Sequence, residues 1–166
     1  MNAELLYGKL LEALRIRKQQ DSFELAGLAM GGAWIAERLA KELGLPHYGV
    51  INVAFHRDDY AEKGMTALRT ASTMTTNLPF DVNGANVILI DDVLFTGRTV
   101  RAALNELFDY GRPAQVELMV LVDRGNRELP VSANFTGEQV QVSDKQNLVL
   151  EKDSAGKFSF QLEGRE

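Results

Sequence analysis

Cysteine, a positive net charge and long apolar runs are all missing from this chain of 166 residues. Without cysteine there are no disulfides and no thiolate chemistry, which favours a reducing compartment, although it also fits an extracellular chain. The net charge of −5 at pH 7 excludes a global basic field that would attract nucleic acid non-specifically, while a local basic face stays compatible with it. We therefore expect no general affinity for nucleic acid.

No apolar run approaches the roughly 20 residues that span a bilayer, and the N-terminus has no apolar signal core. These absences predict a soluble cytoplasmic protein with no membrane partner. The chain does contain 45% hydrophobic residues, which at this length suffice for one core but not for two domains of ordinary size. We predict a single domain over residues 1–166.

Apolar residues alternate between helical spacing and short strand-like runs along the chain. The helical spacing predicts helices at 6–20, 35–43 and 98–110. The short runs predict strands at 23–28, 48–55, 87–90, 116–122, 140–142, 148–150 and 158–162. Strands that alternate with helices indicate an α/β fold with a central, mostly parallel sheet and right-handed crossovers.

Residues 61–77 have no sustained apolar period and are rich in threonine and methionine. We interpret them as one long loop, and loops of this length in compact domains are often lids or binding loops. The alternative is a two-stranded flap with no part in ligand binding.

The segment VILIDDVLFTGRT, residues 87–99, places Asp91 and Asp92 directly after an apolar strand. In open α/β sheets, ligands bind beyond the carboxyl ends of the strands. Two adjacent carboxylates repel each other and are costly to bury without partners. We therefore expect both to face solvent, or a ligand that brings hydroxyl groups or a metal.

The turn that follows, Thr96 to Thr99, leads into a predicted helix whose N-terminal N–H groups favour an anion. Gly97 permits a close approach of the backbone, and the two threonine hydroxyls add donors. Together with the acids, the turn suits a phosphorylated ribose. The alternatives are that Asp91 caps the turn, that Thr96 is an ordinary N-cap and that Arg98 is a surface residue.

This segment resembles the signature with which type I phosphoribosyltransferases bind phosphoribosyl pyrophosphate (PRPP). The segments RAALNELFDYGRPA and LVDRGNRELPV, together with HRDD and LPFDV upstream, resemble the PyrR family of uracil phosphoribosyltransferases and pyrimidine operon regulators. The resemblance covers residues 25–137. It implies the type I phosphoribosyltransferase fold and an enzyme that converts uracil and PRPP to UMP and pyrophosphate.

The resemblance also implies roles for individual residues. Asp91 and Asp92 would hold the ribose hydroxyls, Arg57 would meet the pyrophosphate, and residues 61–77 would form a flexible hood over the reacting centre. The PRPP-binding residues would be Asp91, Asp92, Val93, Leu94, Phe95, Thr96, Gly97, Arg98 and Thr99, the pyrophosphate loop Ala29, Met30, Gly31 and Gly32, and the base site Asp123 and Arg124, for which a strand-end ion pair is the alternative. Mg²⁺ would arrive with PRPP rather than sit in a protein cage, and the chain would form a homodimer or a larger homo-oligomer.

Two departures from the family pattern carry consequences. Ala29 and Met30 stand where the family usually has a polar residue and a threonine, so PRPP affinity or turnover should fall by about one to two decades. Asn126, Ser132 and Glu138 stand where an RNA-binding face needs basic residues, so we rank RNA binding below enzyme activity. The alternatives are a regulator of pyrimidine genes that senses PRPP or UMP, and a phosphoribosyltransferase for another base.

Overall fold

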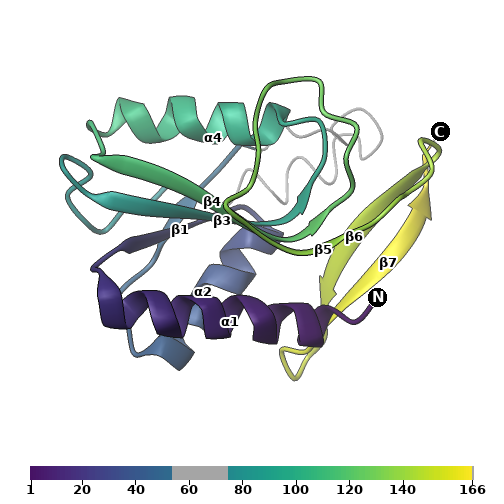
Figure 1. Ribbon diagram of the computed structural model, residues 1–166, viewed down its shortest axis with the longest axis horizontal. Helices are drawn as coiled ribbons and strands as arrows, with labels where there is room; N and C mark the ends of the chain where they lie inside the picture. Colours follow the sequence, from purple (N-terminus) through teal and green to yellow (C-terminus); the bar gives the residue numbers. More distant parts are fainter. Residues whose placement is uncertain (54–74, 166) are drawn as a thin grey trace.

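The computed structural model describes residues 1–53 and 75–165, and its centre is a five-stranded sheet (Figure 1). The strand order is β2-β1-β3-β4-β5. The strands are β1 (Glu24–Leu28), β2 (Gly49–Ile51), β3 (Asn86–Leu94), β4 (Gln115–Asp123) and β5 (Phe135–Gln139). Every neighbouring pair runs parallel, which confirms the predicted α/β architecture.

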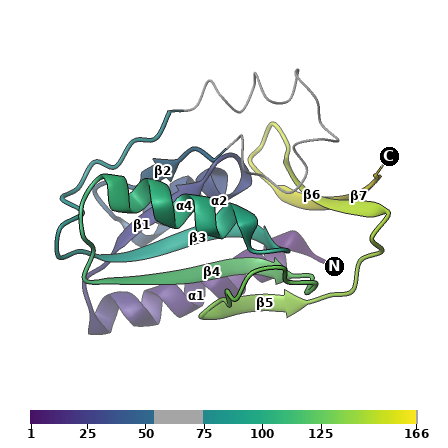
Figure 2. The same ribbon diagram turned by 90° about the horizontal axis from the view of Figure 1, so that it is seen from above.

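Helices cover both faces of this sheet. The helices are α1 (Ala3–Gln20), α2 (Gly31–Leu43) and α4 (Arg98–Asp109). Figures 1 and 2 show α1 and α2 on one face and α4 on the other. Each face has its own buried apolar cluster, one including Leu10 and Leu39 and the other including Val100 and Leu107.

Local sequence accounts for the helix boundaries. The Asn2 side chain accepts a hydrogen bond from Leu5 N–H at 3.1 Å and so caps the start of α1. Helix α2 ends at Gly44, whose φ of 67° is the left-handed conformation that glycine adopts without steric cost. The predicted helices at 6–20, 35–43 and 98–110 are therefore confirmed, with small differences at their ends.

Three strand predictions need correction. The strand predicted at 87–90 continues to Leu94 because β3 keeps pairing with β4 after its pairing with β1 has ended at Ile90. The strand predicted at 140–142 is wrong: the fifth strand is β5, a half-exposed edge strand without apolar alternation, and Val140 and Val142 pack on the core outside it. Of the strand predicted at 48–55, the described residues form a strand only over β2.

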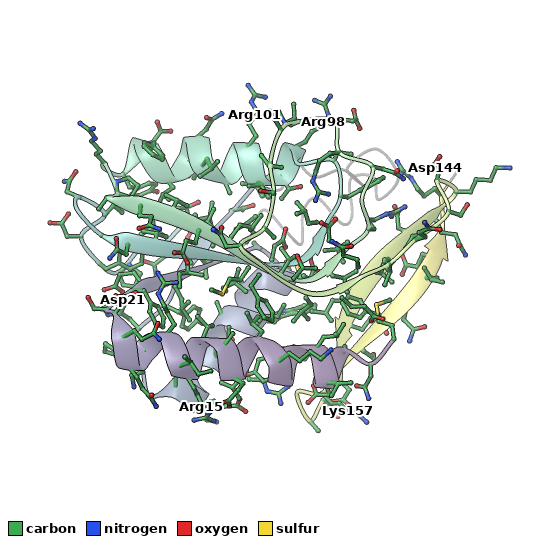
Figure 3. All side chains as sticks on the ribbon, viewed as in Figure 1. Arg15, Asp21, Arg98, Arg101, Asp144 and Lys157 are labelled. Carbon is green, nitrogen blue, oxygen red and sulfur yellow. The ribbon has the colours of Figure 1, made fainter. Side chains whose placement is uncertain are left out.

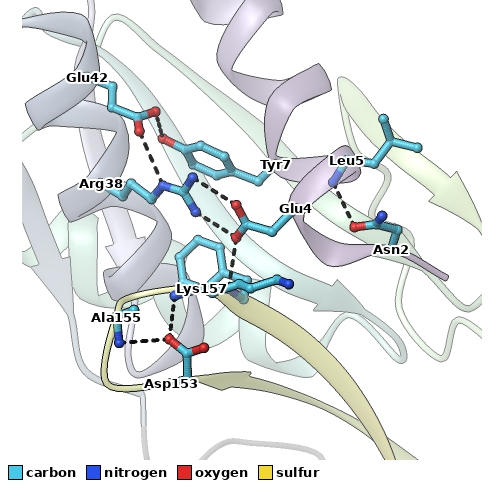
Figure 4. A network of polar contacts seen from close by, with 10 residues as sticks. Asn2, Glu4, Leu5, Tyr7, Arg38, Glu42, Asp153, Ala155 and Lys157 are labelled. Atoms are coloured by element: carbon cyan, nitrogen blue, oxygen red, sulfur yellow. Dashed lines mark hydrogen bonds and ion pairs between the residues drawn. The ribbon is translucent and has the colours of Figure 1, made fainter.

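The strands predicted at 148–150 and 158–162 are confirmed as β6 (Gln146–Lys152) and β7 (Phe158–Gly164). They form a separate antiparallel sheet, which the sequence did not predict. This hairpin lies beside the N-terminal half of α1 (Figure 1). A network of polar side chains connects the hairpin to α1 and α2 (Figure 4). Its members are Glu4, Tyr7, Arg38, Glu42 and the backbone N–H of Phe158.

In the part of the chain that the structure describes, no helix combines the length and the apolar character that crossing a bilayer requires. Arg57 and most of the predicted loop at 61–77 lie outside the described residues. Of that loop, residues 75–77 are described, and Asn77 pairs with Val50 through two backbone hydrogen bonds of 2.9 and 2.8 Å.

Candidate functional site

The carboxyl ends of β1, β3 and β4 meet at one edge of the sheet, where three loops follow them. The loop after β1 leads through Ala29 and Met30 into α2, and the loop after β3 leads through Thr96 and Gly97 into α4. The predicted pyrophosphate loop and the predicted phosphate turn therefore open two helices at the same edge of the sheet.

Asp91 and Asp92 lie inside β3 and not beyond its end. Their side chains are buried, with 4% and 8% of each residue exposed. Asp92 N–H donates to Asp91 Oδ1 at 2.9 Å, and Val93 N–H donates to Asp92 Oδ1 at 2.8 Å. The first of the two expected environments, open solvent, is therefore wrong for both carboxylates. The strand β3 continues through both residues, and the glycines at the start of α2 pack over them.

The glycines that open α2 allow this close approach. A methyl group added at Gly31 would overlap Asp92 Oδ2, and one added at Gly32 would overlap Ile90 O. A methyl group at Gly27 would in turn overlap Gly32 O. The first turn of α2 therefore packs directly on the two acids, which only residues without a side chain permit.

Helix α2 begins without a side-chain cap. Its N-cap residue, Met30, forms no side-chain hydrogen bond to the first turn. Ala29 is buried, precedes Met30 through a cis peptide bond, and donates its N–H to Ile51 O at 2.9 Å. The loop thus offers an anion the backbone N–H groups of a helix N-terminus.

The turn before α4 has a similar construction. Thr96 is 5% exposed, and its Oγ1 accepts a hydrogen bond from Arg98 N–H at 3.2 Å. Gly97 is the N-cap of α4 and has a φ of 96°, a left-handed conformation. Thr96 is therefore a turn residue one position before the cap, and its hydroxyl binds the first N–H of α4, while the N-cap glycine has no side chain to bind the others.

Arg98 matches the surface alternative that the sequence left open. Its guanidinium pairs with Glu128 at 3.1 Å, and about half of each side chain is exposed, 52% and 53%. Figure 3 shows Arg98 and Arg101 pointing away from the sheet on the side of α4. Arg98 thus brings its backbone N–H to the turn while its charge lies in solvent.

Asp123 and Arg124, predicted for the base site, do not pair with each other. Asp123 instead receives two hydrogen bonds from Arg127, at 2.6 and 2.9 Å, and one from Gly125 N–H at 2.9 Å. The Arg127 guanidinium lowers the pKa of the Asp123 carboxyl, and the Gly125 N–H adds to this effect against the opposing effect of burial. An ion pair therefore does form at this strand end, as the alternative interpretation held, but Asp123 pairs with Arg127 and not with Arg124.

Arg124 is buried and holds the segment that leads into β6. It donates to Ser143 O at 3.2 Å and Gln146 O at 3.1 Å, and its guanidinium lies 3.9 Å from the centre of the Phe95 ring. The side chain therefore links the end of β4, the residue after β3 and the connection to the hairpin.

Arg127 was assigned no role from the sequence, although it lies in the RELP motif that supported the family resemblance. Its contacts to Asp123, Phe95 O and Val131 O connect the ends of β3 and β4. The motif indicated the family but not the role of this residue, because no spacing rule distinguishes an arginine that supports a loop from a solvated surface arginine.

No cluster of three or more His, Asp or Glu side chains that could hold a metal ion occurs within residues 1–53 and 75–165. Asp91 and Asp92 are the carboxylates that β3 brings to this edge of the sheet. Their oxygens are the donor type that a hard cation such as Mg²⁺ prefers, and Mg²⁺ commonly takes one or two carboxylates and completes its shell with water and phosphate.

Comparison with known proteins places these features in a family. The model of the phosphoribosyl transferase domain matches residues 3–150. A protein of Ralstonia nicotianae named bifunctional protein PyrR is 50% identical, with 98% of this chain and 95% of that protein covered. A protein of the same name from Nitrosococcus oceani is 40% identical, with 97% and 92% covered.

Solved structures show the same fold. The purine phosphoribosyltransferase from Pyrococcus horikoshii has a TM-score of 0.60 and 24% identity, and the match covers 83% of this chain and 82% of that one. A hypoxanthine-guanine phosphoribosyltransferase from Bacillus anthracis also has a TM-score of 0.60, with 18% identity over 87% and 83% of the two chains. At these identities the likeness concerns the fold alone, which is that of the type I phosphoribosyltransferases.

Proposed function

This chain belongs to the phosphoribosyl transferase domain family and, within it, to the PyrR family, and from this premise we propose that it converts uracil and PRPP to UMP and pyrophosphate. One observation carries the proposal: β3 brings Asp91 and Asp92 to the end of the sheet where α2 and α4 begin, and Gly31 of α2 packs directly on Asp92. This edge of the sheet offers acceptors for the ribose hydroxyls, with an anion site on either side.

We assign the ribose to the two acids and the 5′-phosphate to the turn before α4. A carboxylate has about four acceptor positions, so Asp91 and Asp92 can accept from the 2′ and 3′ hydroxyls in addition to their backbone bonds. The Thr96 hydroxyl accepts from Arg98 N–H and can donate its own proton to a phosphate oxygen. The N–H groups that begin α4 complete the phosphate site.

The pyrophosphate is assigned to the N-terminus of α2. Gly31 and Gly32 bring backbone N–H groups to it, while Ala29 and Met30 contribute no polar side chain. Arg57, which lies outside the described residues, is proposed to add a positive charge. Because the loop lacks a hydroxyl, we keep the expectation that PRPP affinity or turnover is about one to two decades below that of a threonine-bearing loop.

Catalysis in this site would be mainly electrostatic. As the bond from C1′ to the pyrophosphate oxygen breaks, positive charge grows on the ribose ring and negative charge on the leaving group. We assign the buried carboxylates to the first charge and the N-terminus of α2 to the second. N1 of uracil forms the new bond to C1′ as the bond to pyrophosphate breaks, and its proton passes to the departing pyrophosphate or to water. Mg²⁺, bound with PRPP, would neutralise charge on the pyrophosphate.

We place the base beside Asp123 and Arg124, but not in hydrogen bonds to their side chains. The Asp123 carboxylate is held by Arg127, and the Arg124 guanidinium is held by backbone carbonyls and stacked on Phe95. Asp123 would contribute to the base site through its backbone at the end of β4, and Arg124 would contribute by holding the Phe95 ring in place.

Incubation with PRPP, Mg²⁺ and each nucleobase in turn tests the proposal. We expect UMP from uracil, and a reduction of about a hundredfold in Asp91→Asn and Asp92→Asn, since each loses a charge-assisted acceptor. Asparagine keeps an oxygen for the neighbouring backbone N–H, so both variants should fold. If wild type forms no more UMP than these variants do, the proposed reaction is wrong, and product from another base would redirect it to that substrate.

A second activity, regulation of pyrimidine genes through RNA, has the support of one observation: the relatives are named bifunctional proteins. Filter binding to a pyrimidine operon leader RNA, with and without UMP, tests it. Binding that responds to UMP and prefers the leader sequence supports the regulator. Salt-labile binding without sequence preference, unchanged by UMP, eliminates it.

The homodimer or larger assembly stays a prediction from the family resemblance. The cytoplasmic location stays a prediction from the lack of long apolar runs and of an apolar signal core in the sequence. Sedimentation velocity of the purified chain tests the first, and fractionation of cells that express it tests the second.

A further inference from the structure

We propose that Arg127 is a positioning residue, which orients the 5′-phosphate turn through the backbone without touching the substrate. The inference rests on the proposed function, because it assumes that the turn at Thr96 and Gly97 holds the phosphate of PRPP. It assigns a task to an arginine that the PRPP signature, residues 87–99, does not include.

The Arg127 guanidinium ties together two strand ends and one loop. It donates two hydrogen bonds to the Asp123 carboxylate at the end of β4, at 2.6 and 2.9 Å, and one to Phe95 O after β3, at 2.8 Å. Its Nε donates to Val131 O at 3.0 Å. The planar fork of arginine can make these bonds at once, whereas the point charge of lysine cannot.

The loop closed by these bonds, residues 125–131, contacts the turn to which we assign the phosphate. Two consecutive backbone N–H groups of the loop donate to Thr96 O, at 2.8 and 3.1 Å. Val131 packs so close to Gly97 that its Cγ2 would overlap a methyl group added there. The loop therefore fixes both residues of the turn, and Arg127 fixes the loop.

This arrangement predicts a selective effect on ligands. The orientation of the backbone at Thr96 and Gly97 determines where the first N–H groups of α4 point, and these groups meet the phosphate. Loss of Arg127 should weaken every ligand that has a 5′-phosphate, which includes PRPP, UMP and ribose 5-phosphate. Uracil makes no contact with this turn, so its binding should weaken less than that of the phosphate ligands, although the base is placed beside Asp123, the partner of Arg127.

Arg17 provides a matched control. It also makes a bidentate pair with a residue of β4, donating to Glu117 at 2.7 and 2.8 Å, and it donates a third bond to Asp21 at 2.7 Å. The side chains of Arg17 and Arg127 are 21% and 24% exposed, and those of their acceptors on β4, Glu117 and Asp123, are 11% and 13% exposed. Arg17, however, lies at the other end of β4.

The test compares Arg127→Gln with Arg17→Gln in steady-state kinetics and in calorimetric titration with ribose 5-phosphate. We expect Arg127→Gln to raise the KM for PRPP and the Kd for ribose 5-phosphate about ten- to hundredfold, with a smaller rise in the KM for uracil. Arg17→Gln should lower the melting temperature without changing these constants. Equal constants in Arg127→Gln and wild type, or an equal rise in both variants, would overturn the inference.

Val131→Ala keeps the inference testable if Arg127→Gln fails to fold. It removes the Cγ2 methyl that lies against Gly97 and keeps the backbone bond of residue 131 to Arg127, so the Kd for ribose 5-phosphate should rise about two- to fivefold, and no rise would overturn the inference. The titration needs no uracil. A chain that binds ribose 5-phosphate but forms no UMP therefore disproves the proposed reaction, while the ratio of the Kd values still decides for or against Arg127.

Discussion

Two arginines hold opposite ends of β4 with nearly the same geometry. Arg17 donates two hydrogen bonds to Glu117 near the amino end of the strand, and Arg127 donates two to Asp123 at the carboxyl end. Arg17 belongs to the C-terminal part of α1, whereas Arg127 belongs to the loop that donates two backbone hydrogen bonds to Thr96, in the turn before α4. The same kind of ion pair thus attaches a helix at one end and supports the turn before α4, our proposed phosphate site, at the other.

This difference follows from the direction of parallel strands. Their carboxyl ends lead into loops and helix N-termini, where unpaired N–H groups gather, and their amino ends do not. The carboxyl end accordingly holds the glycines of α2, the paired acids of β3 and the left-handed residue at Gly97, the residues to which we assign PRPP. The following predictions sharpen this contrast, beginning with the largest expected effect.

The strongest contrast is between two helical glycines. In Gly32→Ala the new methyl group would overlap Ile90 O, so the free energy of unfolding should fall by about 3 kcal/mol. In Gly8→Ala no heavy atom lies within 4 Å of the new methyl group, and unfolding should cost about 0.5–1 kcal/mol more. Urea denaturation measures both. Equal stability of the two variants would show that α2 does not approach β3 this closely.

The second prediction concerns the pH dependence of the Asp123–Arg127 pair. Because the folded protein lowers the pKa of Asp123, its contribution is fully present above the ordinary carboxyl pKa of about 3.9 and is lost as the pH falls through the lowered value. Asp123→Asn should therefore be less stable than wild type by about 1.5–3 kcal/mol at pH 7. The difference should shrink below pH 4 in urea denaturation, and a difference that grows on acidification would contradict the pairing.

The third prediction moves to the network of Figure 4, away from the ligand end. Tyr7 is buried, and its hydroxyl donates to Glu42 at 2.6 Å, while burial and this carboxylate raise the Tyr7 pKa well above its usual range. Tyr7→Phe should cost about 1 kcal/mol of stability and leave the KM for PRPP unchanged. A raised KM would mean that the network also supports the binding turns.

The smallest effect is expected at the exposed pair of Arg98 and Glu128. Since both side chains are about half exposed, Glu128→Gln should change the free energy of unfolding by less than about 1 kcal/mol. Any change should shrink in high salt. Thermal unfolding at two salt concentrations measures it, and a large, salt-independent loss would show that this pair belongs with the Arg127 support.

Local pattern predicted the elements whose cause is local. The helices follow from apolar spacing together with stop signals such as Gly44, and β4 follows from its continuous apolar run. The fifth strand was placed wrongly because β5 is held by pairing with β4 at a half-exposed edge, and no apolar alternation marks it. Val140 and Val142 carried the apolar signal but pack on the core from outside the sheet.

The site shows the same division. The sequence indicated the acids, the glycines and the turn at Thr96, because each is a residue type needed at a strand end. It did not indicate that β3 continues through Asp92, since that extension depends on pairing with β4 alone. Nor could it choose Arg127 over Arg124 as the partner of Asp123, because that choice depends on the path of the loop from Gly125 to Val131.

The contrast between the two ends of the sheet is tested most directly by hydrogen exchange of the backbone amides, with and without PRPP and Mg²⁺. We predict slower exchange in peptides that cover residues 29–36 and 94–101, where the helix N-termini meet the ligand, and unchanged exchange in those that cover 12–21 and 115–118. Equal protection at both ends, or protection confined to the surroundings of Arg17 and Glu117, would contradict the assignment of PRPP to the carboxyl end.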